Sequence, residues 1–173
     1  PIMNTLFPPE AGTQFSIESF EIGPFPNNAY LLICRAAREV VIVDPSIQSE
    51  EVLARAQQLQ AAGFTLRAIW NTHGHLDHVY DNARWKEVFD VPVMMHQDDD
   101  FLLEHLREQA IWLGFPPVEP IPPDVRFEDG QTVSVGASAA RVLHLPGHSP
   151  GSVAFYFENE NAILSGDFLF RGS

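Results

Sequence analysis

One run of seven residues constrains this chain more than any other: Thr72-His73-Gly74-His75-Leu76-Asp77-His78. It places three imidazoles and one carboxylate close together in the sequence. His73 and His75 are two positions apart, so a chain still extended at the end of a strand would point both rings to one side. Asp77 and His78 follow after one spacer and can face a second ion. Because imidazole and carboxylate hold zinc, iron or manganese, the run predicts a metal site rather than a polar turn with solvated histidines.

Two apolar runs upstream predict the sheet that carries this site. Residues 29–34 and 40–43 are almost continuously apolar, which is typical of strands covered on both faces. Asp44 follows the second run, at the strand end where α/β sheets usually bind ligands. It is a candidate partner of the metal ligands, with a plain turn or helix-cap role as the alternative. Residues 67–71 predict a strand that leads straight into the histidine run, which would therefore lie in a strand-to-helix loop.

The rest of the chain alternates strands with helices and then becomes entirely strand. Five prolines between residues 114 and 124 predict an extended surface connection in the middle. The periodicities predict helices over 49–62 and 79–89, and strands over 15–17 and 20–22 (one strand with a bulge or bend), 91–95, 125–127, 132–135, 140–144, 152–157 and 162–164.

Two later residues extend the list of candidate ligands. His148 lies in the segment Pro146–Ser152, whose glycines and prolines predict a tight loop with this ring pointing outward. Asp167 follows the last predicted strand. We therefore expect an α/β fold with two sheets and helices outside them, a four-layer αββα sandwich that forms a single domain over residues 1–173.

Other polar residues have a structural interpretation. Gln97-Asp98-Asp99-Asp100 precedes an apolar run and predicts a capped helix start, with metal binding by the acidic residues as the alternative. His96 and His105 are predicted to be surface or partly packed residues rather than ligands. His144 is predicted to be a strand residue whose ring is packed or hydrogen-bonded.

Charge and cysteine content exclude some classes of partner. The chain of 173 residues has a net charge of -13 and a single lysine, which argues against nucleic acid and anionic membrane surfaces as partners. Its one cysteine, Cys34, allows no intramolecular disulfide and is predicted to pack in the core. No leader pattern or membrane-spanning run is present, so we expect a cytoplasmic protein. The start at Pro1 leaves a removed leader as an alternative.

Three separated motifs together resemble the metallo-β-lactamase fold superfamily. They are His73-Gly74-His75-Leu76-Asp77-His78, Pro146-Gly147-His148-Ser149-Pro150-Gly151 and Ser165-Gly166-Asp167, in the family's order and spacing. Within the superfamily, the loop 146–152 and the ending 166–173 look most like short bacterial glyoxalase II-type hydrolases. That resemblance implies hydrolysis of acylglutathione thioesters such as S-lactoylglutathione, with a small-molecule substrate as the partner.

The resemblance also implies a role for each ligand. His73, His75 and His148 would hold a first divalent metal ion, Asp77 and His78 a second, and Asp167 would bridge the two. Zinc is the first expectation, with iron or manganese as alternatives. The ions would supply hydroxide to attack the thioester carbonyl and would stabilise the oxyanion. Asp77 is the expected catalytic residue, because it can orient the nucleophile or accept its proton.

The chain departs from the family pattern at two places. Tyr80 stands where relatives commonly carry glycine, so its phenol is expected to line or narrow the mouth of the pocket. The family's seventh ligand, a later histidine, and its glutathione-gripping basic residues lie beyond Ser173. We therefore expect a fold truncated at its C-terminus, with one tight and one weak metal site.

Other functions share the same visible ligands. An iron-dependent persulfide dioxygenase would need only two histidines and an aspartate. A lactonase or a true β-lactamase is a further alternative among hydrolases. A catalytically silent binding module that retains the fold is the non-enzyme alternative.

Overall fold

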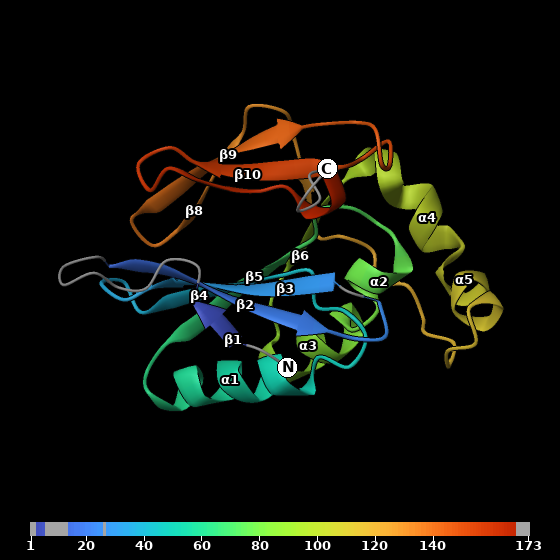
Figure 1. Cartoon of the computed structure of the whole chain (residues 1–173), viewed down its shortest axis with the longest axis horizontal. Helices are drawn as coiled ribbons and strands as arrows, with labels where there is room; N and C mark the ends of the chain where they lie inside the picture. Colours follow the sequence, from blue (N-terminus) through green and yellow to red (C-terminus); the bar gives the residue numbers. More distant parts are fainter. Residues whose placement is uncertain (1–2, 6–13, 26, 169–173) are drawn as a thin grey trace.

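The computed structural model describes residues 3–5, 14–25 and 27–168, and its strands form two sheets that stack face to face (Figure 1). The larger sheet has seven strands in chain order. Its first four strands are antiparallel, whereas β4 to β7 are parallel. The strands are β1 (Met3–Thr5), β2 (Phe15–Ile22), β3 (Asn27–Cys34), β4 (Glu39–Val43), β5 (Thr65–Trp70), β6 (Val93–His96) and β7 (Val125–Phe127).

The smaller sheet has four antiparallel strands in the order β11-β10-β9-β8. These are β8 (Thr132–Val135), β9 (Ser138–His144), β10 (Val153–Phe157) and β11 (Ala162–Leu164). Buried and exposed residues alternate along β8 and through Ser138–Val142 of β9, as expected for strands that pack on the core with one face only. A short 3-10 helix, η2 (Gly166–Phe168), follows β11.

Helices cover the outer face of the larger sheet and one end of both sheets. The helices α1 (Glu50–Ala61) and α3 (Asn82–Phe89) pack on the outer face (Figure 1). Four shorter elements gather at the end: α2 (Leu76–Val79), η1 (Gln97–Asp99), α4 (Asp100–Glu104) and α5 (Leu106–Trp112). Among the described residues, no helix covers the outer face of the four-stranded sheet, so this part of the chain supplies one of the two outer layers of the αββα sandwich.

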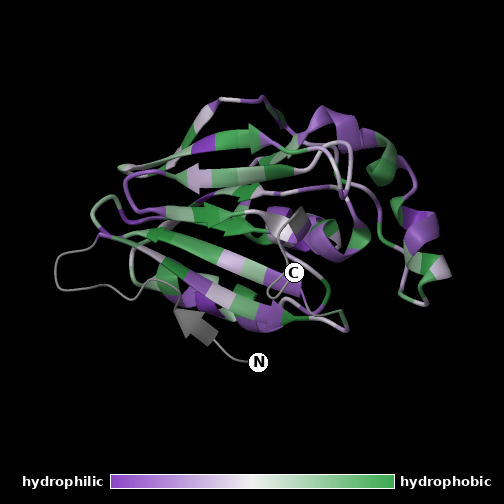
Figure 2. Ribbon diagram, turned by 45° about the horizontal axis from the view of Figure 1, so that its top comes forward, coloured by the Kyte–Doolittle hydropathy of each residue, from purple (hydrophilic) through white to green (hydrophobic). Residues whose placement is uncertain are grey.

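Two apolar cores hold the layers together. Between the sheets, Trp70 stacks against Phe155 with ring centroids 4.9 Å apart, and Phe127 meets both rings edge-on. Such aromatic pairs contribute about 0.5–1.5 kcal/mol beyond the apolar area they bury. Cys34 is buried in this core, as predicted. The second core lies between the larger sheet and the helices α1 and α3. Figure 2 shows the strands of the two sheets coloured mainly as hydrophobic.

The prediction of a bulge in the first long strand was wrong. Strand β2 is continuous over eight residues and pairs with β3 without a shift in register. Its apolar residues change phase because they serve different cores: Phe15 and Ile17 face the smaller sheet, whereas Phe20 and Ile22 face α1 and α3. A strand covered on both faces can change the side of its larger residues without a break.

One helix prediction also needs correction. The helix expected over 79–89 is divided into α2, which begins inside the histidine run, and α3, with Tyr80 and Asp81 between them. Strand β3 begins at Asn27, two residues before the apolar run at 29–34; Pro26 and residues 169–173 of the chain's ending lie outside the described residues. In the described ranges, no helix combines the length and apolar character needed to cross a membrane.

Candidate metal centre

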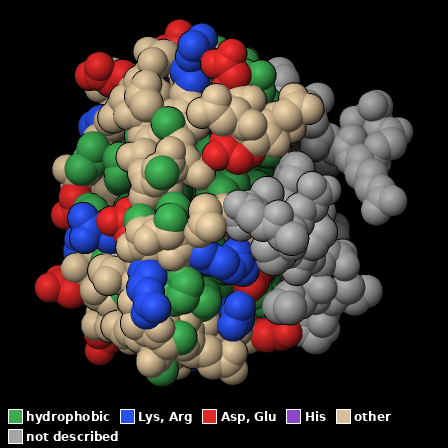
Figure 3. Space-filling model, turned by 90° about the vertical axis from the view of Figure 1, so that its left-hand side faces the viewer, with side chains coloured by type: hydrophobic (Ala, Val, Ile, Leu, Met, Phe, Trp, Pro, Cys, Tyr) green, Lys and Arg blue, Asp and Glu red, His purple; other side chains and the backbone are tan. Residues whose placement is uncertain are grey.

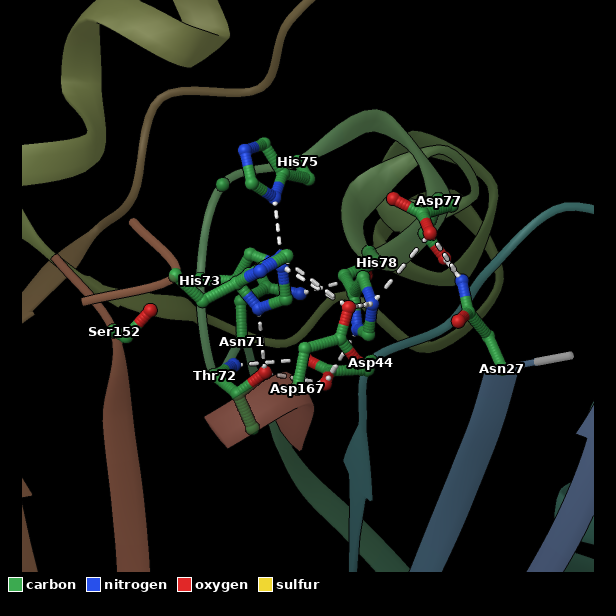
Figure 4. Close-up of polar contacts among 12 residues, drawn as sticks. Asn27, Asp44, Asn71, Thr72, His73, His75, Asp77, His78, Ser152 and Asp167 are labelled. Atoms are coloured by element: carbon green, nitrogen blue, oxygen red, sulfur yellow. Dashed lines mark hydrogen bonds and ion pairs between the residues drawn. The ribbon is translucent and has the colours of Figure 1, made fainter. Parts of the chain in front are cut away.

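The predicted ligands come from both sheets and meet at the end of the molecule that α2 covers. His73 and His75 lie in the loop after β5, and His78 lies in α2. From the smaller sheet, His148 lies in the loop between β9 and β10. Asp167 lies in η2, beside the other ligands (Figure 4). The opposite end of the molecule shows no histidine among its described side chains (Figure 3). The sheet packing therefore brings residues far apart in sequence into one polar cluster.

A single carboxylate oxygen of Asp167 faces three of the imidazoles. Its Oδ2 lies 3.3 Å from Nε2 of His78 and 3.3 Å from Nε2 of His148. The same oxygen lies 4.0 Å from Nε2 of His73. Asp167 therefore stands between the histidines of the larger sheet and the histidine of the smaller sheet.

Three of the histidines also converge on one another. Nδ1 of His75 lies 2.9 Å from Nε2 of His148, and the His73 ring lies 4.8 Å from each of these two rings. Their ligand atoms are close enough together to hold one ion, and so are those of the set His73, His78 and Asp167. Since His73 belongs to both sets, two ions in this cluster would be neighbours.

Asp44 and Thr72 fix which nitrogen each buried histidine offers (Figure 4). Asp44 accepts hydrogen bonds from the Thr72 hydroxyl at 2.6 Å and from Nδ1 of His78 at 2.9 Å. Because the hydroxyl proton of Thr72 is directed to Asp44, its oxygen accepts from Nδ1 of His73 at 3.0 Å. Nε2 of His73 and Nε2 of His78 are then buried nitrogens without a hydrogen-bond partner. Two buried nitrogens that lack a hydrogen-bond partner and face one carboxylate fit a metal ion.

The same contacts set the protonation of the site. Burial lowers the pKa of His78, but the charge of Asp44 and the Asp167 carboxylate, 3.3 Å from Nε2, outweigh burial and raise this pKa to about 10. Burial, together with the neighbouring histidines, holds the pKa of His73 far below its ordinary value. Burial raises the pKa of Asp167, but the nearby His78 imidazole and the charges of the other histidines lower it overall. In the absence of a cation, His78 therefore supplies the positive charge that faces Asp44 and Asp167.

Asp77 lies at the edge of the cluster. Its Oδ2 is 3.7 Å from Nε2 of His78, and the Asn27 amide donates to this carboxylate and, at 3.2 Å, to the backbone carbonyl of Asp77. Asn27 is the first residue of β3, so the larger sheet sets the direction of this side chain. The sequence motif contains no signal for this contact, which joins residues 50 positions apart.

The acidic run before α4 does not cap the helix as predicted. Asp99 occupies the N-cap position of α4, but its side chain makes no cap hydrogen bond. The carboxylate is instead fully buried and accepts from Gly74, Ser149 and Gly151, in the two loops that carry His73, His75 and His148. Donors in loops of the two sheets therefore bind this carboxylate in place of the N-terminal N–H groups of α4.

A further set of possible ligands consists of His96, Asp98 and His144. The two imidazole rings are stacked at 4.0 Å with an interplanar angle of 16°. Nδ1 of His96 accepts from the backbone N–H of Asp98, and Nε2 of His144 donates to the carbonyl of Pro150 at 2.8 Å. The nitrogens that face Asp98, Nδ1 of His96 and Nε2 of His144, are thus already paired. Stacked rings are also poorly arranged to share an ion, since the metal must lie near each ring plane. His144 is packed and hydrogen-bonded, as predicted, whereas His96 is more deeply buried than expected and His105 is exposed.

Tyr80 reaches away from the histidines to the proline-rich connection. Its hydroxyl donates to the carbonyl of Pro116 at 2.9 Å, and its ring packs edge-on against Phe115 at 6.3 Å. Phe115 in turn contacts Phe25, next to the start of β3. Tyr80 thus anchors the connection over residues 114–124 beside α2.

The two stacked sheets and the histidine–aspartate cluster at their shared end define a protein of the metallo-hydrolase class. The chain belongs to the metallo-beta-lactamase superfamily, whose family model matches residues 22–173. This membership confirms the fold predicted from the three motifs, and members of this fold bind divalent metal ions.

Similar proteins with named functions include further hydrolases. Hydroxyacylglutathione hydrolase GloC of Haemophilus influenzae is 33% identical over 159 residues, which cover 91% of this chain and 73% of that protein. The probable metallo-hydrolase YqgX of Bacillus subtilis is 32% identical over 152 residues, which cover 87% of this chain and 70% of that protein. Among solved structures, TTHA1623 in a di-iron-bound form is 39% identical with a TM-score of 0.76, covering 90% of this chain and 74% of that one. The B3 metallo-beta-lactamase BLEG-1 is 31% identical with a TM-score of 0.76, covering 90% of this chain and 73% of that one.

Proposed function

We propose that this protein is a metal-dependent thioester hydrolase that cleaves acylglutathione substrates. The observation that carries the proposal is the position of Asp167, one oxygen of which faces nitrogens of His73, His78 and His148. A carboxylate between two groups of histidines is suited to bridge two cations.

Six side chains would hold the ions. His73, His75 and His148 form the first ligand set, Asp77 and His78 belong to the second, and Asp167 is shared. Support comes from the unpaired Nε2 atoms of His73 and His78 and from the 2.9 Å approach of His75 to His148. Neutral imidazole and carboxylate suit zinc, iron and manganese alike. The di-iron form of TTHA1623 makes iron a direct alternative to zinc.

When bound, two divalent ions supply a water molecule of lowered pKa and polarise the substrate carbonyl. The protein's own residues would prepare that chemistry. Asp44 keeps the Nδ1 proton of His78 and, through Thr72, that of His73, so that both Nε2 atoms stay available. Asp77, held by Asn27, would orient the attacking water and accept its proton. A thiolate is a good leaving group, so the site needs no strong acid opposite it.

The acylglutathione class is supported by the name of the Haemophilus influenzae relative. The test is hydrolysis of S-lactoylglutathione by the metal-loaded protein, compared with a thioester of a simple thiol such as S-lactoyl-mercaptoethanol. We expect cleavage of both, with a higher kcat/KM for the glutathione thioester. His75→Ala should abolish cleavage and remove bound metal. Equal metal content and activity in that variant would refute the hydrolase proposal.

A persulfide dioxygenase is the second candidate, because His73, His78 and Asp167 form a set of two histidines and one carboxylate. Oxygen uptake on glutathione persulfide by the iron-loaded protein would favour this reaction. Thioester cleavage without oxygen uptake would favour the hydrolase. The same preparation, loaded with iron or with zinc, serves both assays.

A further inference from the structure

One buried carboxylate outside the ligand sets joins the two loops that carry them. Asp99 follows β6, and its side chain is 0% exposed. Its Oδ2 accepts from the backbone N–H of Gly74 at 2.8 Å and from the Ser149 hydroxyl at 2.7 Å. Its Oδ1 accepts from the backbone N–H of Gly151 at 2.7 Å. Gly74 separates His73 from His75, while Ser149 directly follows His148.

The surroundings of Asp99 are shaped to receive this side chain. A Cβ on Gly74 would lie 3.1 Å from Cβ of Asp99, and a Cβ on Gly151 would lie 2.7 Å from its Cγ. Glycine therefore lets both backbones approach the carboxylate closely. The Ser149 hydroxyl also forms a hydrogen bond with the Ser152 hydroxyl, with the two oxygens 2.8 Å apart. The three donors replace the water that a buried carboxylate would otherwise need.

This arrangement sets the distance between the loops. The backbone N–H of Val153 also donates to the carbonyl of Thr72 at 2.8 Å, which ties the bases of the two loops together. Asp99 joins the two loops at a second place, next to His75 and His148. Nδ1 of His75 lies 2.9 Å from Nε2 of His148.

We infer that Asp99 is a positioning residue for the metal centre: its buried carboxylate holds the His73–His75 loop and the His148 loop at the spacing that one ion requires. The inference rests on the proposed metal-dependent function. It assigns Asp99 no contact with the metal or the substrate. Residues that orient ligands in this way typically change metal affinity about 10–100-fold when they are replaced.

Asp99→Asn is the informative substitution because it keeps the size of the side chain. The carboxylate accepts a backbone N–H at each oxygen, so either orientation of the amide places an NH2 group against a backbone donor. Ser149→Ala is the milder second variant, which removes one donor and leaves both glycine contacts. Asp100→Asn is the matched control, because this neighbouring carboxylate is partly exposed and pairs with Arg126 away from both loops.

The experiment measures Zn²⁺ affinity by competition with a chromophoric chelator and the visible spectrum of the Co²⁺-loaded protein, using the full chain. Thermal unfolding of the metal-free variants reports on their folding. We expect Asp99→Asn to weaken the tighter Zn²⁺ site about 10–100-fold and to alter the Co²⁺ spectrum. Ser149→Ala should weaken the site less, and Asp100→Asn should match the wild type.

The outcomes separate the inference from the proposed function. If wild-type protein binds Zn²⁺ and both Asp99→Asn and Ser149→Ala bind it equally well, Asp99 has no positioning role, while the hydrolase proposal stands. A lower unfolding temperature with unchanged affinity and Co²⁺ spectrum would also overturn the inference, since it indicates a purely structural contact. If the wild-type chain binds no divalent metal at all, both the proposed function and the inference fail.

Discussion

The carboxylate of Asp44 lies 2.9 Å from Nδ1 of His78, and its backbone adopts a positive φ of 53°. This left-handed conformation is uncommon for residues other than glycine, although aspartate and asparagine adopt it more readily than most. It occurs where β4 ends and allows the side chain to turn back toward Thr72 and His78. Of the two roles considered for Asp44, turn residue and support of the ligands, the contacts favour the second.

Asp44→Asn should weaken metal binding without unfolding the protein. Asparagine tolerates a positive φ, so the substitution removes the charge and one acceptor while keeping the backbone conformation. The Nδ1 protons of His78 and, through Thr72, of His73 are then less firmly held, and we expect Zn²⁺ affinity to fall about 10–100-fold. Chelator competition measures this change. Asp81→Asn, which alters a partly buried carboxylate bonded to Ser49 instead, is the control. Equal affinity in wild type and Asp44→Asn would contradict the role assigned to Asp44.

Gly166→Ala should destabilise the protein through a clash with Thr72. Gly166 has a φ of 53°, and an added Cβ would lie 2.5 Å from the Thr72 hydroxyl oxygen. Gly130, with a φ of 75° and nothing within 4 Å of an added Cβ, provides a matched control for the backbone conformation alone. We expect Gly130→Ala to cost about 1 kcal/mol and Gly166→Ala about 1–3 kcal/mol more, in chemical unfolding. Equal losses would show that Thr72 moves aside without cost.

The sequence predicted the strands and the candidate ligands because both depend on local patterns. The apolar runs at 29–34 and 40–43 are buried on both faces in β3 and β4, and the motif residues His75 and His148 approach to 2.9 Å. The role of Asp99 could not be predicted, because an acidic residue before an apolar run has the same local pattern whether it caps a helix or binds distant loops. Asn27 was missed for a related reason: its contact with Asp77 exists only once β3 and α2 have packed together.

The buried histidine His96, which stacks on the ring of His144, should make stability depend on pH. Burial, and then the neighbouring His144, lower the pKa of His96 below its ordinary value. A histidine with a lowered folded pKa binds its proton more readily in the unfolded chain, so its contribution to stability is present above about pH 6.5 and is lost as the pH falls. His96→Gln keeps an acceptor for the N–H of Asp98 and removes this titration.

Chemical unfolding at pH 7 and pH 5 checks this prediction. We expect the free energy of unfolding to fall more between these pH values in the wild type than in His96→Gln, with both proteins at the same metal content. His105→Gln, which replaces an exposed histidine, controls for the loss of an imidazole. Parallel pH dependence in the wild type and His96→Gln would exclude a contribution from His96.

Asn27→Ala should reduce turnover more than metal binding at the first site. The Asn27 amide donates to both the carboxylate and the backbone carbonyl of Asp77, so its removal frees the side chain proposed to orient the attacking water. We expect kcat for thioester cleavage to fall about tenfold, with little change in the affinity of the tighter Zn²⁺ site, because Asn27 makes no contact with its three histidines. Asn28→Ala is the matched control, since Asn28 is exposed and its amide oxygen accepts only from Ser19 among the described contacts. An Asn27→Ala enzyme with wild-type kcat would show that Asp77 needs no support from β3, and a loss confined to KM would point to substrate binding instead.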